Sequence, residues 1–253
     1  MIPLHEQRTF IRGELAKLGA ALQFDRLDRY ADELEADQSL KSGIESKVAN
    51  VEFFRTKHWD SLFRLGLYRF VQYALVRAVK PEGVIETGVL HGLSSAFPLA
   101  ALACNAGEAS PGRMISIDAP STYEQGPSNQ DGFDDTLPPN LGPGWAIPDE
   151  LRPRWQLKIG TSQQFLASAL AELGTIGLFI HDSEHTNETM LFEFETAWPA
   201  LADGGILLAD NIDVNTSFFD FARSKARIAH VLPVDPDHAM PGASGIRCGL
   251  LRK

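Results

Sequence analysis

The chain has 253 residues, of which 44% are hydrophobic and 22% charged, and its formal net charge is −10. This length and mixture predict a globular protein with a large core, while the acidic balance argues against nucleic acid as a partner, because phosphate backbones are also negative. No apolar run reaches the ~20 residues of a membrane span and the N-terminus lacks a signal-peptide pattern, so we expect a cytoplasmic protein that contacts no membrane.

Residues 1–80 have the spacing of helices. The segment "FIRGELAKLGAALQFDRLDRYADELEADQSL" carries apolar residues at intervals of three and four, which is typical of amphipathic helices. A second segment, "WDSLFRLGLYRFVQYALVRAVK", predicts a more apolar helix that ends before Pro81. We expect residues 1–80 to form a helical extension or cap, whose apolar faces are compatible with a homo-oligomer.

From residue 81 the pattern changes to short apolar strands that alternate with helices. Strands are predicted at "GVIETG", "RMISID", "WQLKIG", "TIGLFI" and "GGILLAD", and the turn Asp203-Gly204-Gly205 is expected to precede the fifth. Helices are predicted over "SSAFPLAALACNAG" and "ETMLFEFETAWPAL". Alternation of this kind indicates a parallel sheet with helices on both faces, over residues 81–253.

The last two predicted strands, in "IAHVLPVD" and "GIRCGLLRK", are joined by a connection too short for a crossover helix, so they should be antiparallel. The expected fold is therefore α/β: a Rossmann-like, doubly wound sheet of seven strands, mostly parallel with an antiparallel C-terminal strand, plus N-terminal helices. Residues 119–153 are rich in Pro and Gly and too many for an ordinary connection, which predicts either a substrate lid or a disordered loop.

A glycine-containing turn, "VIETGVLHGLSS", follows the first strand of the sheet. Its spacing is not that of the dinucleotide fingerprint G-x-G-x-x-G. Glu86 and the acid that ends the next strand, Asp118, should lie side by side at the carboxyl edge, where a carboxylate suits the hydroxyls of a ribose. Either glycine alone is explained by tight packing of the turn, but the group as a whole favours a nucleoside ligand.

The arrangement E-x-G-x-x-x-G-x-S, followed by an acid that ends the second strand, resembles that of the class I S-adenosylmethionine-dependent methyltransferases. The resemblance extends from about Trp59 to the C-terminus. It implies that the glycine turn holds the methionine end of S-adenosylmethionine, that the acid binds the ribose and that "IGTS" lies near the adenine. The residues assigned to this cofactor are Glu86, Gly88, Gly92, Ser94, Asp118, Thr161, Ser162 and Asp182.

The stretch "IGLFIHDSEHTNETM" can be interpreted in two ways. His181, Glu184 and His185 spell H-x-x-E-H, a zinc-peptidase motif that requires a helix. The β-branched and aromatic residues of "TIGLFI" favour a strand instead, which places Asp182 at a strand end. Asp210 and Asn211 end the neighbouring strand, and ends of adjacent strands lie ~5 Å apart, so the three side chains form a candidate Mg²⁺ site. The alternative is that Asp182 caps a helix and Asp-Asn forms a turn.

The pattern "FIHDSEHT…W…L…GGILLADN" is similar to that of the metal-dependent small-molecule O-methyltransferases, which include sugar and catechol types. This resemblance implies a hydroxyl acceptor, with Mg²⁺ or another divalent cation held by Asp182, Asp210 and Asn211. Sugar enzymes have an acid where this chain has Glu184, and catechol-type enzymes a lysine at the position of His185. We favour His185 as the general base with Glu184 assisting, a sugar as the acceptor, and a phenol or catechol as the second choice.

Two other functions compete with this hypothesis. Ser94, Asp210 and His230 follow the order of one type of serine-hydrolase triad. A methyltransferase fold could also bind S-adenosylmethionine without catalysis, or act without metal.

Overall fold

Seven strands form one sheet in the part of the chain that the computed structural model describes, residues 3–49, 51, 61–119, 137–138, 140–233 and 247–253. The strand order is β3-β2-β1-β4-β5-β7-β6, and β7 runs antiparallel to both of its neighbours while the others are parallel. The strands are β1 (Gly83–Thr87), β2 (Arg113–Asp118), β3 (Trp155–Ile159), β4 (Ile176–His181), β5 (Leu201–Ala209), β6 (His230–Val231) and β7 (Gly249–Arg252). The predicted fold class is confirmed.

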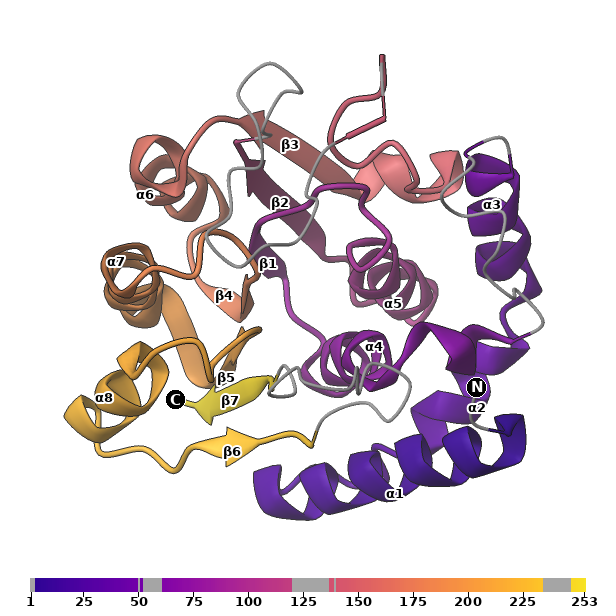
Figure 1. Ribbon diagram of the computed structural model, residues 1–253, viewed down its shortest axis with the longest axis horizontal. Coiled ribbons are helices and arrows are strands. Elements are labelled where there is room, and N and C mark those ends of the chain that lie inside the picture. Colours follow the sequence, from indigo (N-terminus) through magenta and orange to yellow (C-terminus); the bar gives the residue numbers. More distant parts are fainter. Residues whose placement is uncertain (1–2, 50, 52–60, 120–136, 139, 234–246) are drawn as a thin grey trace.

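Helices cover both faces of this sheet (Figure 1). One face carries α6 (Ser162–Leu173), α7 (Asn187–Ala197) and α8 (Ser217–Ser224), and the other carries α4 (Leu67–Val79) and α5 (Ala96–Gly107). Alternate strand residues supply the two cores: Val84 and Leu178 face α4 and α5, while Ile85 and Phe179 face α6 and α7. Within the described ranges, three short 3₁₀ helices connect these elements: η2 (Leu62–Leu65), η3 (Asp149–Arg154) and η4 (Trp198–Ala200).

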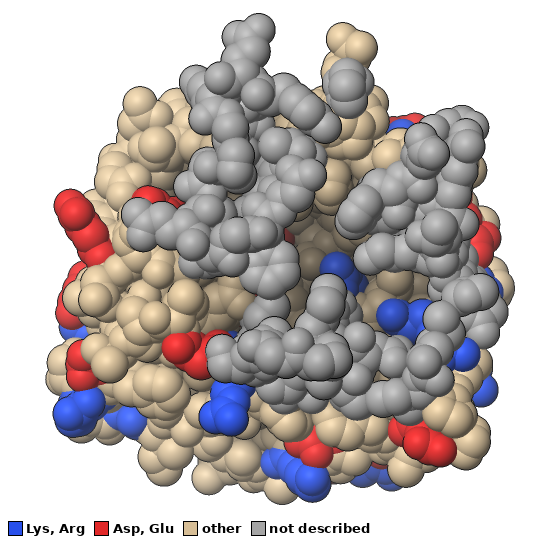
Figure 2. Space-filling model, viewed as in Figure 1, with Lys and Arg blue, Asp and Glu red and all other residues tan. Residues whose placement is uncertain are grey.

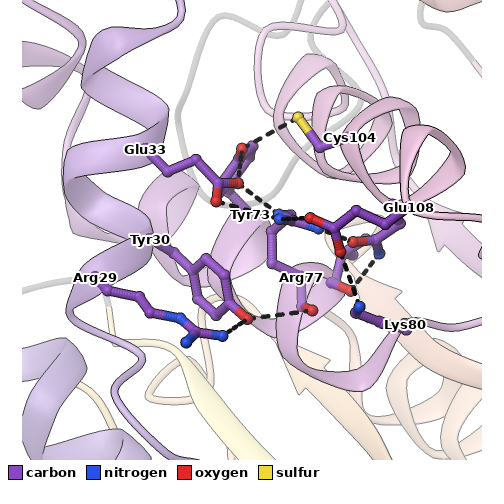
Figure 3. Close-up of polar contacts among 10 residues, drawn as sticks. Arg29, Tyr30, Glu33, Tyr73, Arg77, Lys80, Cys104 and Glu108 are labelled. Atoms are coloured by element: carbon purple, nitrogen blue, oxygen red, sulfur yellow. Dashed lines mark hydrogen bonds and ion pairs between the residues drawn. The ribbon is translucent and has the colours of Figure 1, made fainter.

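The N-terminal helices α1 (Leu4–Leu22), α2 (Arg29–Ala36) and α3 (Gln38–Val48) pack outside α4 and α5 (Figure 1). Their buried residues belong to the same apolar cluster as one face of the sheet. An ionic cluster reinforces this contact: the buried Arg77 of α4 pairs with Glu33 of α2 and Glu108 beyond α5 (Figure 3). The Tyr73 hydroxyl also donates to Glu33, over 2.6 Å. The predicted boundary near residue 80 is therefore crossed by a continuous core.

Two local expectations need correction. Asp203, Gly204 and Gly205 lie within β5 rather than in a turn before it, and the pairing of β4 with β5 shifts register between Ile176 and Leu178. The helix expected over residues 59–80 begins at Leu67, because Gly66 has φ 92° and separates it from η2.

The predicted lid or disordered loop, residues 119–153, falls largely outside the described residues. Its described C-terminal part does not fit either interpretation. Ala146 and Ile147 are fully buried in the core, and η3 leads directly into β3. This part of the segment is a packed connection between β2 and β3.

Candidate active site

Glu86, near the end of β1, points into the protein interior. Its side chain is 1% exposed, and its Oε2 accepts hydrogen bonds from the hydroxyls of Ser95 (2.8 Å) and Ser116 (2.7 Å). Burial raises the pKa of Glu86 to about 7, although the two serine hydrogen bonds oppose that rise. Ser116 in turn accepts from the indole of Trp155. The carboxylate thus joins β1, β2 and the turn before α5, and its contact with a cofactor stays a prediction.

Asp118 ends β2 and fixes the glycine turn from the side. Its Oδ2 accepts hydrogen bonds from the backbone N–H groups of Val89 (2.6 Å) and Leu90 (2.8 Å). Burial raises the pKa of Asp118 above its ordinary value, against the lowering effect of these two amides. Its charge adds to the rise in the pKa of Glu86. The structure thus brings the two acids together at the carboxyl edge, as expected, and ribose binding by Asp118 stays a prediction.

Gly88 and Gly92 are required by close contacts within the chain. Both have positive φ, 82° and 81°. A Cβ atom at Gly88 would lie 1.8 Å from the carbonyl oxygen of Asp182, and one at Gly92 would lie 2.7 Å from the Cα of Gly144. Packing therefore explains both glycines, while Ser94 lies in the turn that leads into α5.

Thr161 and Ser162 lie where β3 joins α6. Thr161 is the N-cap of α6 and forms a capping box with Gln164. Ser162 is buried, its hydroxyl donates to Oε1 of Gln163 over 3.3 Å, and it helps to lower the pKa of Glu193 on α7. Both side chains therefore have structural partners, and their assignment to the adenine stays a prediction.

The segment Ile176–His181 is strand β4, and the residues after it form a loop before α7, so the helix that an H-x-x-E-H zinc site needs is absent from these residues. The zinc-peptidase alternative is wrong. His181 is fully buried and its Nδ1 lies 2.6 Å from Oε2 of Glu193. His181 therefore has a structural role at the end of β4.

Glu193 is the common acceptor for the ends of two strands. Besides His181, it accepts hydrogen bonds from Thr87, the last residue of β1 (2.5 Å), and from Ser183 in the loop after β4 (2.7 Å). Burial would raise the pKa of Glu193, but His181 and the hydroxyl donors outweigh it and hold the pKa below its ordinary value. One buried carboxylate therefore positions the β1 and β4 ends relative to each other.

Asp182 and Asp210 end β4 and β5 and lie near the same two buried groups. The Cys248 thiol donates to Oδ1 of Asp210, with 2.9 Å between sulfur and oxygen. Burial raises the pKa of Cys248, and the charges of Asp210 and Asp182 raise it further. The same two carboxylates raise the pKa of Tyr68 on α4, where burial is again the larger cause. The strand ends that carry the two acids are adjacent, since the Asp210 amide donates to the His181 carbonyl over 2.9 Å, while a cation shared by the two side chains stays a prediction.

His185 is held beside Asn211. The Asn211 amide nitrogen lies 3.3 Å from Nε2 and 3.4 Å from Nδ1 of the His185 ring, and Asn215 donates to the His185 carbonyl over 2.9 Å. The ring of His185 also meets that of His181 edge-on, with 5.3 Å between centroids. Glu184 is directed instead toward α7, where its Oε2 accepts from the hydroxyl of Thr189 over 2.8 Å.

The donors predicted for a divalent cation suit Mg²⁺ in their chemistry, since Asp182, Asp210 and Asn211 offer only hard oxygen ligands. Among the described residues Asp210 is in no ion pair, and its negative charge raises the pKa of Tyr68 and of Cys248. A cation bound at this position would offset that negative charge. The Cys248 thiol, however, engages one Asp210 oxygen, and the described residues hold no cluster of three His, Cys, Asp or Glu side chains that could bind a metal. The three side chains therefore suit Mg²⁺ in their chemistry, but in the described part of the chain they are not already arranged as a metal site.

The serine-hydrolase alternative does not fit this geometry. Ser94 follows β1 and His230 begins β6, and these strands are separated in the sheet by β4, β5 and β7. With ~4.8 Å between neighbouring strands, the two residues lie on the order of 19 Å apart across the sheet. Ser94, Asp210 and His230 do not form a triad.

The comparisons with known proteins agree with this architecture. A family model described as a methyltransferase domain matches residues 85–212, which is half of the chain. The chain belongs to this methyltransferase-domain family. The resemblance inferred from the glycine turn and the strand-end acids is thereby confirmed. No curated protein sequence matches the chain.

Solved structures share the methyltransferase fold at low sequence identity. The O-methyltransferase from Bacillus cereus in complex with SAH is 15% identical, with 86% of this chain and 91% of that one covered and a TM-score of 0.50. The O-methyltransferase TomG from Streptomyces achromogenes, solved in complex with SAM, is 12% identical, with coverage of 89% and 94% and a TM-score of 0.52. The calicheamicin methyltransferase CalS11 is 18% identical, with coverage of 85% and 92% and a TM-score of 0.50.

Several residues of this methyltransferase site escaped the sequence prediction. Glu193 carries a signal that could have been used, because it lies on the helix face formed by Thr189, Met190, Phe194 and Ala197, all buried. An acid on an otherwise buried helix face implies a polar partner. Tyr68 and Cys248 carry no comparable signal, since their proximity to Asp210 depends on contacts between distant parts of the chain.

The surface around the site carries charges of both signs. On the face shown in Figure 2, acidic and basic side chains of the described residues are interspersed around the rim instead of forming one basic stripe. None of the described helices combines the length and the apolar character that crossing a bilayer requires.

Proposed function

We propose that this methyltransferase-family protein transfers a methyl group from S-adenosylmethionine to a hydroxyl of a small molecule. The observation that carries the proposal is the shared carboxyl edge. Glu86 and Asp118 lie beside the glycine turn at β1 and β2, while Asp182, Asp210 and His185 lie at β4 and β5. A donor and an acceptor bound at these two places would be neighbours, and such proximity can lower the barrier by several kcal/mol, on the order of 7 or more in favourable cases.

In the proposed reaction the acceptor oxygen forms a bond to the methyl carbon as the carbon–sulfur bond of the sulfonium breaks. The oxygen must lose its proton, and His185 is the better placed of the two candidate bases. Its ring lies beside Asn211 at the β5 end, whereas Glu184 is hydrogen-bonded to Thr189 on α7. A ring nitrogen of neutral His185 would take up the proton near neutral pH.

A divalent cation, if bound, would be held by Asp182, Asp210 and Asn211, and it would supply positive charge that favours an ionised acceptor hydroxyl. The residues themselves orient this region. Glu193 fixes the end of β4 through its hydrogen bonds with His181 and Ser183. Because these two residues flank Asp182, the backbone of Asp182 is held in place. The alternative, a metal-independent transfer, is favoured by one observation: the Cys248 thiol already engages an Asp210 oxygen.

Two measurements separate these possibilities. Calorimetry with S-adenosylhomocysteine, with and without Mg²⁺, tests cofactor binding. Transfer of a radiolabelled methyl group to catechol or to methyl α-D-glucopyranoside, chosen to represent the phenol and sugar classes, tests turnover.

Metal assistance predicts that excess EDTA and Asp210→Ala each reduce turnover to background, while Asp213→Ala leaves most of it. Asp213 is a matched control because it supplies a carboxylate from the same turn, with its Oδ1 accepting from the backbone of Arg247. Full turnover in EDTA would exclude the metal, whereas failure to bind S-adenosylhomocysteine would exclude the methyltransferase function itself.

A further inference from the structure

Tyr68 brings a hydroxyl from α4 to the carboxyl edge of the sheet. It is the second residue of α4, and its ring packs against the apolar cluster between that helix and the sheet. Cys248, the donor to Asp210, belongs to the same cluster. The charges of both Asp182 and Asp210 reach the phenol, which places its oxygen near the two acids assigned to the acceptor side.

The hydroxyl of Tyr68 is buried, yet within the described part of the chain it makes no hydrogen bond. Gln72, one turn further along α4, is close enough to lower the pKa of the phenol slightly, but the two groups do not meet the geometry of a hydrogen bond. Buried polar groups in folded proteins nearly always have a partner, so an unpaired hydroxyl beside a functional edge indicates a bound molecule that completes it.

The chemistry of this hydroxyl defines what it would contact. Burial, together with the charges of Asp182 and Asp210, raises the pKa of Tyr68 well above its ordinary value. The phenol therefore keeps its proton across the physiological range and acts as a hydrogen-bond donor. A buried donor within electrostatic reach of the two carboxylates suits an oxygen of a ligand bound at this edge of the sheet.

We propose that the Tyr68 hydroxyl donates a hydrogen bond to an oxygen of the methyl acceptor and so is a binding and specificity residue contributed by the helical N-terminal part of the chain. This inference rests on the proposed function, and it adds an acceptor contact that lies outside the sheet.

Tyr68→Phe is the test, because it removes only the hydroxyl. The Michaelis constant for catechol or methyl α-D-glucopyranoside, whichever the wild type methylates, should rise about three- to tenfold, the range expected for one hydrogen bond. The affinity for S-adenosylhomocysteine should be unchanged. The midpoint of thermal unfolding should stay equal or rise, because no internal hydrogen bond is lost.

Tyr73→Phe is the matched control on the same helix. Its hydroxyl is paired with Glu33 of α2 over 2.6 Å (Figure 3). This variant should lose several degrees of thermal stability, about 3–10 °C, because it breaks a hydrogen bond to a charged group, and its Michaelis constant should match that of the wild type.

An unchanged Michaelis constant in Tyr68→Phe would overturn the proposal, and so would a loss of stability as large as that of Tyr73→Phe, since the hydroxyl would then be structural. If the wild type binds S-adenosylhomocysteine but methylates neither probe, the acceptor class of the proposed function fails. In that case the thermal unfolding of Tyr68→Phe still tests whether the hydroxyl is structural. A lower midpoint than that of the wild type contradicts the proposal, and an equal or higher midpoint supports it.

Discussion

The buried carboxyl of Glu86 should make the stability of the protein depend on pH. In the folded protein its pKa is about 7, compared with 4.5 for an ordinary glutamate. Between these two values the unfolded chain has released the proton while the folded protein still holds it. The free energy of unfolding therefore falls as the pH rises from about 4.5 to 7, and this contribution is constant above and below that window.

The size of the effect follows from the shift in pKa. A difference of about 2.5 units corresponds to about 3 kcal/mol, at about 1.4 kcal/mol per unit. Glu86→Gln removes the titration and keeps an oxygen for Ser95 and Ser116, which both donate to the same atom of Glu86. Relative to the wild type, this variant should gain about 3 kcal/mol between pH 4.5 and pH 7.

Urea unfolding of both proteins from pH 4.5 to pH 8 measures this difference directly. Glu82→Gln, an exposed glutamate just before β1, is the control and should follow the wild type. Asp118 is also buried and titrates in both proteins, and because its charge raises the pKa of Glu86, the difference between the two curves includes the interaction of the two acids. Parallel curves for wild type and Glu86→Gln across the whole range would refute the reasoning, because they would mean that the carboxyl is solvated or compensated in the folded state.

Two further substitutions test the packing of the site. Gly88→Ala should destabilise the protein by more than about 3 kcal/mol or prevent folding, because φ is 82° and the new Cβ would lie 1.8 Å from the carbonyl oxygen of Asp182. Gly13→Ala in α1, where a Cβ meets nothing within 4 Å, should instead stabilise by about 0.5–1 kcal/mol, and equal effects in urea unfolding would contradict this account. Glu193→Ala should cost about 3–5 kcal/mol, since it leaves His181, Thr87 and Ser183 without their acceptor, whereas Glu188→Ala at the exposed start of α7 should cost under about 1 kcal/mol. A Glu193 variant as stable as the Glu188 variant would show that the buried carboxylate is not a structural link.

The strands and the positions of the acids at their ends could be predicted because both depend on local sequence. An apolar run followed by a polar residue marks a strand end, and the rules for parallel sheets then bring Asp182 and Asp210 to one edge. The same reasoning rejected the H-x-x-E-H motif, since residues before it have the composition of a strand.

What could not be predicted depends on contacts between distant parts of the chain. Cys248 meets Asp210 only because β7 is inserted beside β5, and Tyr68 reaches the same edge only because α4 packs across the sheet. Local rules also failed at Asp203-Gly204-Gly205, which lie within β5, at the irregularity between the residues Leu201 and Ile206 that pair with β4.

The salt-bridged Arg77 cluster shown in Figure 3 has a consequence for protein engineering. Because that guanidinium spans α2, α4 and the end of α5, the first third of the chain cannot be exchanged for its counterpart from another methyltransferase as an independent module. A chimera joined at residue 80 would keep Arg77 with Glu33 but separate both from Glu108, which pairs with the same guanidinium. Grafts intended to change acceptor preference should therefore carry Glu33, Arg77 and Glu108 together, or exchange only the loops that connect these helices.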